Sequence, residues 1–314
     1  MVKVKDIKWS KGIKVSHLVK SLSTTGFQAV ELGKAVECIS KMKRENAKIY
    51  LTFTSNMVTT GLRGFFAQII KLKMADVIIT TVGSIEEDIM KAIGEDFFIG
   101  NYSADDVGLH EKGINRVGNL LIRNESYEKF ESYMLDILRK LYEKKNRYSV
   151  TEMLREIGLM LNDENSILYQ AAKNNVPVFC PAITDGSFGF HLFMFQQDNK
   201  DFVVDVVKDF ADLIFSSTHD DKKGIIALGG GVSKHHAILG TLLNGGADYA
   251  VYMTTAHEYS GSLSGATTRE AKSWGKIKDA ADAVTVIGDV SITFPLAMMS
   301  VLDILSDEGI INEE

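Results

Sequence analysis

The sequence predicts an α/β protein with a doubly wound, mainly parallel sheet. Short apolar runs rich in β-branched residues recur along the chain, a loop of small residues follows each run, and an amphipathic stretch follows each loop. Strands that are apolar throughout are typical of a parallel sheet with helices on both faces. Ligands bind such folds at the carboxyl ends of the strands, so the loops of small residues are candidate ligand sites.

Six apolar runs are expected to form the strands: residues 49–53, 77–81, 176–179, 225–228, 249–253 and 284–287. Small residues follow them at 54–56, 83–84, 184–186, 229–231, 254–255 and 288–289. Residues 127–146 and 151–162 have helical spacing, with Ser149 or Thr151 as the N-cap of the second helix. No change in composition marks a boundary, so we expect a single domain over residues 1–314 with extra helices in the middle.

The composition is that of an ordinary globular protein. The chain has 314 residues and a mass of 34.7 kDa, with 45% hydrophobic and 24% charged residues, which excludes intrinsic disorder and fibrous repeats. Its 35 basic and 41 acidic residues give a net charge of −6. An acidic surface repels nucleic-acid phosphates and attracts cationic partners, so we expect no nucleic-acid partner.

Cysteine content and hydropathy favour a cytoplasmic protein. Cys38 and Cys180 are far apart, which indicates neither a disulfide framework nor a zinc site, and free cysteines fit a reducing compartment. Residues 1–9 are charged and lack the apolar core of a signal peptide. No apolar run approaches the roughly 18 residues of a membrane span. We therefore expect no membrane association and no metal.

A triple glycine, Gly229 to Gly231, follows the fourth strand and precedes a predicted helix. Glycines there let backbone amides approach a phosphate, and the start of the helix adds partial positive charge. They can equally form a tight turn that packs against a neighbouring helix. Asp185 and Asp289 also follow strands, where an acid either accepts hydrogen bonds from ribose hydroxyls or caps the next helix.

Several acids have two interpretations. Glu86, Glu87 and Asp88 lie near the start of a predicted helix, where acids interact favourably with the helix dipole. Alternatively they form an anionic wall for a cationic ligand. Glu270 has the same two interpretations.

His235 and His236 are adjacent, so on a helix their side chains point about 100° apart and only one can face a given ligand. That imidazole can act as a base near neutral pH. Lys276 follows Trp274 and Gly275. It is either a solvated surface lysine or, if desolvated, a nucleophile that forms a Schiff base.

Taken in order, these segments resemble the deoxyhypusine synthase family over nearly the whole chain. The densest matches are Leu-Gly-Gly-Gly-Val-Ser-Lys-His-His at 228–236, Gly-Ala-Asp-Tyr-Ala-Val-Tyr at 246–252, Gly-Ser-Leu-Ser-Gly-Ala at 261–266 and Ser-Trp-Gly-Lys-Ile at 273–277. Further matches lie at 25–29, 55–56, 86–88, 113–119 and 184–187. The Trp-Gly-Lys segment, at its distance from the glycine and histidine segment, is highly specific.

The resemblance implies a Rossmann-like, NAD-binding fold and an NAD-dependent aminobutyl transfer. Spermidine is oxidised to an imine, an active-site lysine captures the 4-aminobutyl group, and 1,3-diaminopropane leaves. The group then passes to a specific lysine of the hypusine-containing translation factor precursor, where NADH reduces the new imine. The family also implies a homotetramer with active sites at a subunit interface.

The resemblance assigns roles to individual residues. Lys276 is the nucleophile and His235 the base or proton shuttle. The NAD contacts are Ser55, Asn56, Met57, Val58, Thr59, Thr81, Val82, Gly83, Asp185, Gly230, Thr255, Ala256, Asp289 and Val290. The polyamine contacts are Glu86, Glu87, Trp274, Glu270, Gly261 and Ser262, with Trp274 packing on the methylenes.

The chain also departs from the better-known eukaryotic members and looks like the archaeal branch. Phe190 and Leu263 replace polyamine-binding acids, Leu239 replaces an asparagine, and Ser260 replaces a usual aspartate. Losing carboxylates leaves a trivalent cation less compensated. This motivates an alternative, a homospermidine-synthase-like enzyme that transfers the aminobutyl group to a free amine.

Overall fold

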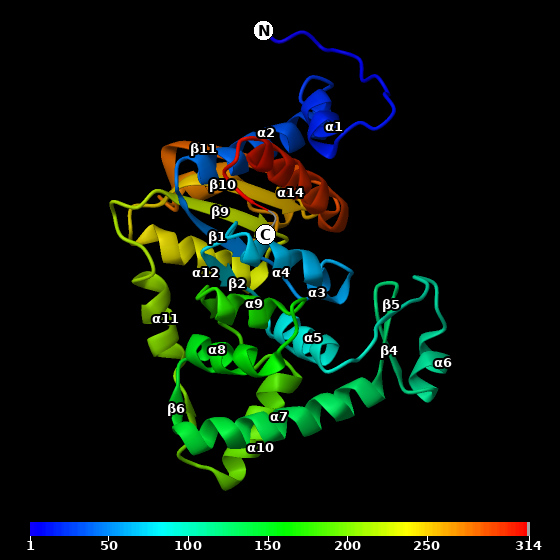
Figure 1. Ribbon diagram of the computed structural model, residues 1–314, viewed down its shortest axis with the longest axis vertical. Helices are drawn as coiled ribbons and strands as arrows, with labels where there is room; N and C mark the ends of the chain where they lie inside the picture. Colours follow the sequence, from blue (N-terminus) through cyan, green and yellow to red (C-terminus); the bar gives the residue numbers. More distant parts are fainter. Residues whose placement is uncertain (313–314) are drawn as a thin grey trace. The chain divides into compact units, whose positions relative to one another are not determined.

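The computed structural model describes residues 1–312 and confirms the predicted α/β class (Figure 1). Contacts divide the chain into two compact units. The first consists of Met1–Phe53, Leu72–Ile79 and Asp212–Glu314, and the second of Thr54–Lys71 and Thr80–Ala211. A single domain over residues 1–314 stays a prediction.

The first unit is built on parallel strands. They are β1 (Lys48–Thr52), β2 (Val77–Ile79), β9 (Lys223–Leu228), β10 (Ala247–Thr254) and β11 (Ile277–Ile287), in the spatial order β11-β10-β9-β1-β2. All residues of β2 and β9 are buried, and so are four of the five in β1. Burial on both faces explains why these strands are apolar throughout rather than alternating.

Helices cover both faces of these strands. They are α1 (Val15–Leu22), α2 (Phe27–Arg44), α12 (Gly231–Leu242), α13 (Thr268–Ser273) and α14 (Val290–Asp307), together with a single 3-10 turn at Glu258–Ser260. Figure 1 shows α2 and α14 on one face of the strands and α12 on the other. The first unit therefore has the doubly wound arrangement that the sequence predicts.

By length and composition alone, helix α14 is long and apolar enough to cross a membrane. An apolar run of this length was not expected from the sequence. In the structure it packs against α1, α2 and β10. Phe294, Met298, Val301 and Leu305 on this helix are fully buried. These contacts are those of a core helix, whose hydrophobicity serves internal packing.

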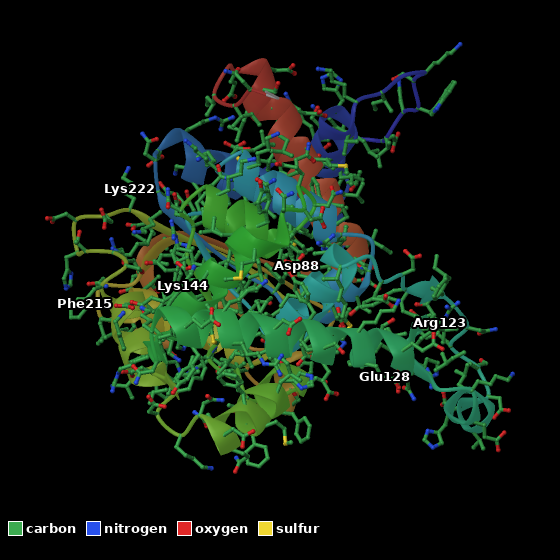
Figure 2. All side chains as sticks on the ribbon, turned by 60° about the horizontal axis from the view of Figure 1, so that its bottom comes forward. Asp88, Arg123, Glu128, Lys144, Phe215 and Lys222 are labelled. Carbon is green, nitrogen blue, oxygen red and sulfur yellow. The ribbon has the colours of Figure 1, made fainter. Side chains whose placement is uncertain are left out.

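The second unit is mainly helical. Its helices are α3 (Asn56–Thr59), α4 (Arg63–Lys71), α5 (Val82–Ala92), α6 (Asp106–Glu111), α7 (Asn124–Lys144), α8 (Val150–Leu161), α9 (Ile167–Lys173) and α10 (Ser187–Asp198), and α11 (Val206–Ile214) leads into the first unit. Helix α5 contacts α3, α7, α9 and α10. Figure 2 shows α7 running between the labelled Arg123 and Lys144.

Short strands complete the second unit. A three-stranded antiparallel sheet has the order β3 (Phe98–Ile99), β5 (Leu120–Arg123) and β4 (Ile114–Val117). A parallel pair joins β6 (Arg147–Tyr148) and β8 (Val203–Val204), and β7 covers Val178–Phe179. The sequence did not predict the antiparallel sheet. The predicted helices correspond to α7 and α8, and Ser149 caps α8 in a capping box with Glu152.

One buried carboxylate joins three segments of the second unit. Asp88 on α5, labelled in Figure 2, is 1% exposed. It accepts hydrogen bonds from Arg63 Nε at 2.5 Å, Ser166 Oγ at 2.8 Å, and the backbone N–H groups of Ile167 and Leu168 at 3.1 and 2.8 Å. It therefore neutralises a nearly buried guanidinium and also satisfies the first turn of α9.

We expect Asp88→Ala to lower the free energy of unfolding by about 3–5 kcal/mol, because it removes the buried carboxylate on Arg63 Nε and the acceptor for the first turn of α9, and leaves the guanidinium only its pair with Asp163. The matched control is Asp106→Ala, which breaks the exposed Asp106–Arg116 pair and should leave the free energy of unfolding nearly unchanged. Equilibrium denaturation by urea measures both. A loss for Asp88→Ala no larger than that of the control contradicts this assignment.

Candidate active site

The strand ends of the first unit bring one set of predicted residues together. The register pairs Leu228 with Met253 and Thr254 with Ile287, so β9, β10 and β11 end at the same edge. The backbone N–H of Gly229 donates to Met253 O at 2.8 Å, and that of Gly288 donates to Thr254 O at 3.0 Å. The loops after these strands carry Gly230, Thr255, Ala256, Asp289 and Val290, which therefore lie along one sheet edge.

The glycine turn also touches the 261–266 segment, which contains Gly261 and Ser262. A Cβ on Gly230 would come within 2.3 Å of Ser264 Cα, so no other residue fits there without a shift of the backbone. The Gly231 N–H donates to Ser264 Oγ at 3.2 Å, and Thr254 Oγ1 donates to Ser264 O at 3.3 Å. The glycines thus form a tight turn at the predicted ligand edge, and Gly230 packs against the 261–266 segment rather than against a neighbouring helix.

The two strand-end aspartates differ. Asp289 is the N-cap of α14 and accepts from the N–H and Oγ of Ser291 at 2.8 and 2.6 Å. It is nevertheless exposed, so one carboxylate can cap the helix and also face a ligand. Asp185 is exposed as well, but the N-cap of α10 is Gly186, and no side chain caps that helix. The capping interpretation therefore holds for Asp289 and fails for Asp185.

Lys276 lies just before β11, beside Trp274 and near His235. Its Nζ is 5.0 Å from the Trp274 ring centroid, and the ring is 66% exposed. The Lys276 carbonyl accepts from Ala247 N–H at 3.1 Å, which fixes its backbone at the start of β10. Burial lowers the pKa of His235, and the charge of Lys276 lowers it further. A neutral imidazole beside an amine is the pair that proton removal requires.

His236 and Glu270 are the other two candidate residues in this part of the first unit, and their environments differ from that of His235. Burial lowers the pKa of His236 to about 4, so this imidazole stays neutral at physiological pH. Glu270 is exposed on the first turn of α13, as the helix-dipole interpretation expects. The two adjacent imidazoles thus differ in burial, and only that of His235 lies beside the charge of Lys276.

The second unit holds the remaining predicted residues. Helix α3 carries Asn56, Met57, Val58 and Thr59, and the N–H of its N-cap, Ser55, donates to Thr81 Oγ1 at 3.0 Å. A Cβ on Gly83 would lie 2.8 Å from Ser55 Cβ, which is a close approach across the same pair of loops. Residues 55–59 and 81–83 thus form one cluster, with Val82 starting α5.

Glu86 and Glu87 are buried, which the helix-dipole interpretation does not predict. Each is 7% exposed. Glu86 Oε1 accepts from Phe188 N–H at 2.8 Å, and Glu87 Oε2 accepts from Thr59 Oγ1 at 2.7 Å. Burial raises the pKa of both and brings that of Glu87 to about 7. The hydrogen-bond donors to these two buried carboxyls are neutral backbone and hydroxyl groups, so the carboxyls are suited to a cation that neutralises them.

Two residues near these acids escaped the sequence analysis. Lys91 donates to the carbonyls of Val58 at 2.7 Å and Thr59 at 3.1 Å, and its charge lowers the pKa of Glu87. Burial raises the pKa of Tyr127 to about 12, and Glu86 and Glu87 add to this rise. Neither residue lies in a recognisable motif, because their proximity comes from packing on α5 and α7.

Among residues 1–312, no group of three or more His, Cys, Asp or Glu side chains is placed to hold a metal ion.

Comparisons with known proteins show which family the chain is similar to. The deoxyhypusine synthase family model matches residues 17–301. A protein named probable deoxyhypusine synthase in Thermoplasma acidophilum is 41% identical over 300 residues, which cover 94% of this chain and 96% of that protein. The deoxyhypusine synthase of Senecio vernalis is 39% identical over 324 residues, covering 94% and 87%.

The chain belongs to the deoxyhypusine synthase family. A solved structure from Entamoeba histolytica, assigned to the same synthase, matches with a TM-score of 0.70 and 31% identity and covers 96% of this chain and 97% of that one. The residues that depart from the expected family pattern have varied surroundings. Phe190 is 58% exposed on α10, whereas Leu239 on α12 and Leu263 are half-buried and Ser260 ends the 3-10 turn.

The raised pKa of Glu87 gives this family member a testable pH dependence. Because the pKa of the folded state lies above that of the unfolded chain, the folded protein binds more protons between about pH 4.5 and 7. The Glu87 contribution to the free energy of unfolding therefore falls as pH rises through this range, by roughly 3 kcal/mol. Glu87→Gln should remove this slope in denaturation curves measured across pH.

The matched control is Glu128→Gln, because Glu128 is exposed on α7 (Figure 2) and should leave the slope unchanged. If the free energy of unfolding depends on pH in the same way in wild type and Glu87→Gln, the prediction is wrong, because the Glu87 carboxyl then ionises near its ordinary pKa.

Proposed function

We propose that this chain catalyses deoxyhypusine synthesis. It transfers the 4-aminobutyl group of spermidine to a specific lysine of the hypusine-containing translation factor precursor. Membership in the family supports the activity, and the grouping of Lys276, a neutral His235 and Trp274 is the observation that carries the assignment of the site. Transfer to a free amine is not favoured, because the named relatives are deoxyhypusine synthases.

NAD fits the first unit. Three adjacent parallel strands end in Gly229–Gly231, Thr255–Ala256 and Gly288–Asp289, which offer close backbone approach and one exposed carboxylate for ribose hydroxyls. We assign the NAD contacts in this unit to Gly230, Thr255, Ala256, Asp289 and Val290. In the second unit we assign them to residues 55–59, 81–83 and Asp185. NAD held by these residues would supply the hydride acceptor and donor that the reaction needs.

In the proposed mechanism, Lys276 forms the covalent bond. Its neutral amine attacks the imine carbon of oxidised spermidine, and the bond from that carbon to the nitrogen of the propyl side then breaks as the carbon–Lys276 imine forms. The Lys276 nitrogen loses two protons in this exchange, and the departing nitrogen gains two and leaves as the free amine of 1,3-diaminopropane. His235 relays these protons one at a time, because its imidazole is neutral. The lysine of the acceptor protein then displaces Lys276 in the same way, before hydride reduces the new imine.

The polyamine needs apolar and anionic partners. We propose that the exposed Trp274 ring packs on the methylenes, and that Glu86, Glu87 and Glu270 neutralise ammonium groups, with Gly261 and Ser262 lining the path. We also propose a cytoplasmic homotetramer without nucleic-acid or membrane partners. The family resemblance supports the tetramer, and the net charge of −6 suits a polycationic substrate.

We expect Lys276→Arg to abolish aminobutyl transfer by orders of magnitude, because a guanidinium is always protonated and cannot form the imine. Borohydride trapping and peptide mass mapping should locate an aminobutyl adduct on Lys276 of the wild type. The matched control is Lys272→Arg, whose Lys272 donates to Asp279 O at 2.7 Å instead of facing His235. An adduct on another lysine, or normal turnover of Lys276→Arg, would refute the assignment.

We expect the protein to prefer NAD over NADP, because a carboxylate at Asp289 accepts from the ribose 2′-hydroxyl and repels a 2′-phosphate. Asp289→Asn keeps a good N-cap for α14, so its free energy of unfolding should stay within about 1 kcal/mol of wild type. NAD affinity in calorimetry should fall roughly tenfold, and the preference over NADP should narrow. Unchanged selectivity in Asp289→Asn would remove Asp289 from the cofactor site.

A further inference from the structure

Lys234 is a buried cation that the mechanism above does not use. It lies on α12, directly before His235, and is 1% exposed. Its Nζ donates to Leu263 O at 2.9 Å and Ala266 O at 2.7 Å, and lies 4.2 Å from the centroid of the Tyr252 ring. Two backbone dipoles and one aromatic face thus hold this charge.

The two carbonyls that Lys234 holds bracket a short piece of chain. Between them lie Ser264, which bonds the glycine turn, and Gly265, where a Cβ would come within 2.0 Å of His257 O. The 261–266 segment thus packs between the glycine turn on one side and His257, in the loop after β10, on the other. The ammonium ties both carbonyls to the same helix that carries His235.

We infer that Lys234 is a positioning residue, whose ammonium clamps the 261–266 segment onto the glycine turn and thereby sets Gly261 and Ser262 relative to His235. The inference rests on the proposed function in one respect, because Gly261 and Ser262 are proposed polyamine contacts. The clamp itself rests on hydrogen bonds and burial alone.

An apolar side chain cannot replace this clamp. A methionine would fill a similar volume but would leave the carbonyls of Leu263 and Ala266 without their donor, and a buried unsatisfied carbonyl is costly. Desolvation also strengthens the attraction between the ammonium and the Tyr252 ring. Burial lowers the pKa of Lys234 to about 8, and Glu270 partly opposes this. The chain thus keeps a cation where desolvation disfavours one.

The same unit offers a matched control in Lys223, at the start of β9. Lys223 is 0% exposed, and its Nζ donates to Thr218 O at 2.9 Å and Asp221 O at 2.6 Å. Both lysines are buried ammonium groups held by backbone carbonyls. Lys223 lies at the amino end of its strand, whereas the glycine turn follows the carboxyl end.

The test compares Lys234→Met with Lys223→Met by hydrogen–deuterium exchange on the full-length protein without ligands. Both variants should lose thermal stability. Exchange of the amides in 261–266 should accelerate by about tenfold or more in Lys234→Met and stay at the wild-type rate in Lys223→Met. If Lys234→Met does not fold, Lys234→Gln, which retains a neutral donor, takes its place in the same comparison.

Steady-state kinetics then separate positioning from a general loss of stability. Lys234→Met should raise KM for spermidine more than it lowers kcat, and Lys234→Arg, which keeps charge and donors, should restore part of the loss. Wild-type exchange in 261–266 of Lys234→Met, or equal acceleration in both methionine variants, overturns the inference. If the wild type shows no aminobutyl transfer, the proposed function fails, while the exchange comparison still decides whether Lys234 holds the segment.

Discussion

The second unit depends on the hydrogen bonds that converge on Asp88. Consecutive residues on a helix point about 100° apart, so fixing one side chain fixes the rotation of its neighbours. Asp88 is held by Arg63 and by the first turn of α9. Glu87 therefore turns to Thr59 and Glu86 to the backbone of Phe188. Without these hydrogen bonds to Asp88, α5 would be free to rotate about its axis, and Glu86 and Glu87 would no longer point toward Phe188 and Thr59.

The parallel strands could be predicted because burial on both faces leaves its mark on composition. Five of the six predicted runs overlap the strands of the first unit, with ends that differ by up to seven residues, as at the start of β11, and the sixth overlaps β7. The antiparallel sheet could not be predicted in this way. Phe98 and Ile99 of β3 are exposed and the strand has two residues, so no periodicity marks it.

The site was predictable to a different degree for each residue type. The glycine turn and the strand-end acids follow from their position after apolar runs. The role of Lys276 does not, since a lysine beside Trp and Gly is more often solvated, and only the resemblance favoured the nucleophile over the solvated lysine. Glu86, Glu87 and Asp88 look alike in sequence, yet Asp88 is structural and the other two have raised pKa values. Lys91, Tyr127 and Lys234 owe their roles to burial, which a sequence does not display.

The burial of Glu87 has a consequence for ligand binding. With a pKa of about 7, this carboxyl carries a proton in a substantial fraction of molecules at neutral pH. A cation that pairs with it needs the ionised form and must expel that proton into the solvent. Uptake of a positively charged ligand beside Glu87 is then an exchange of one cation for another. Its measured heat would depend on the ionisation enthalpy of the buffer, and its affinity on the acidity of the compartment.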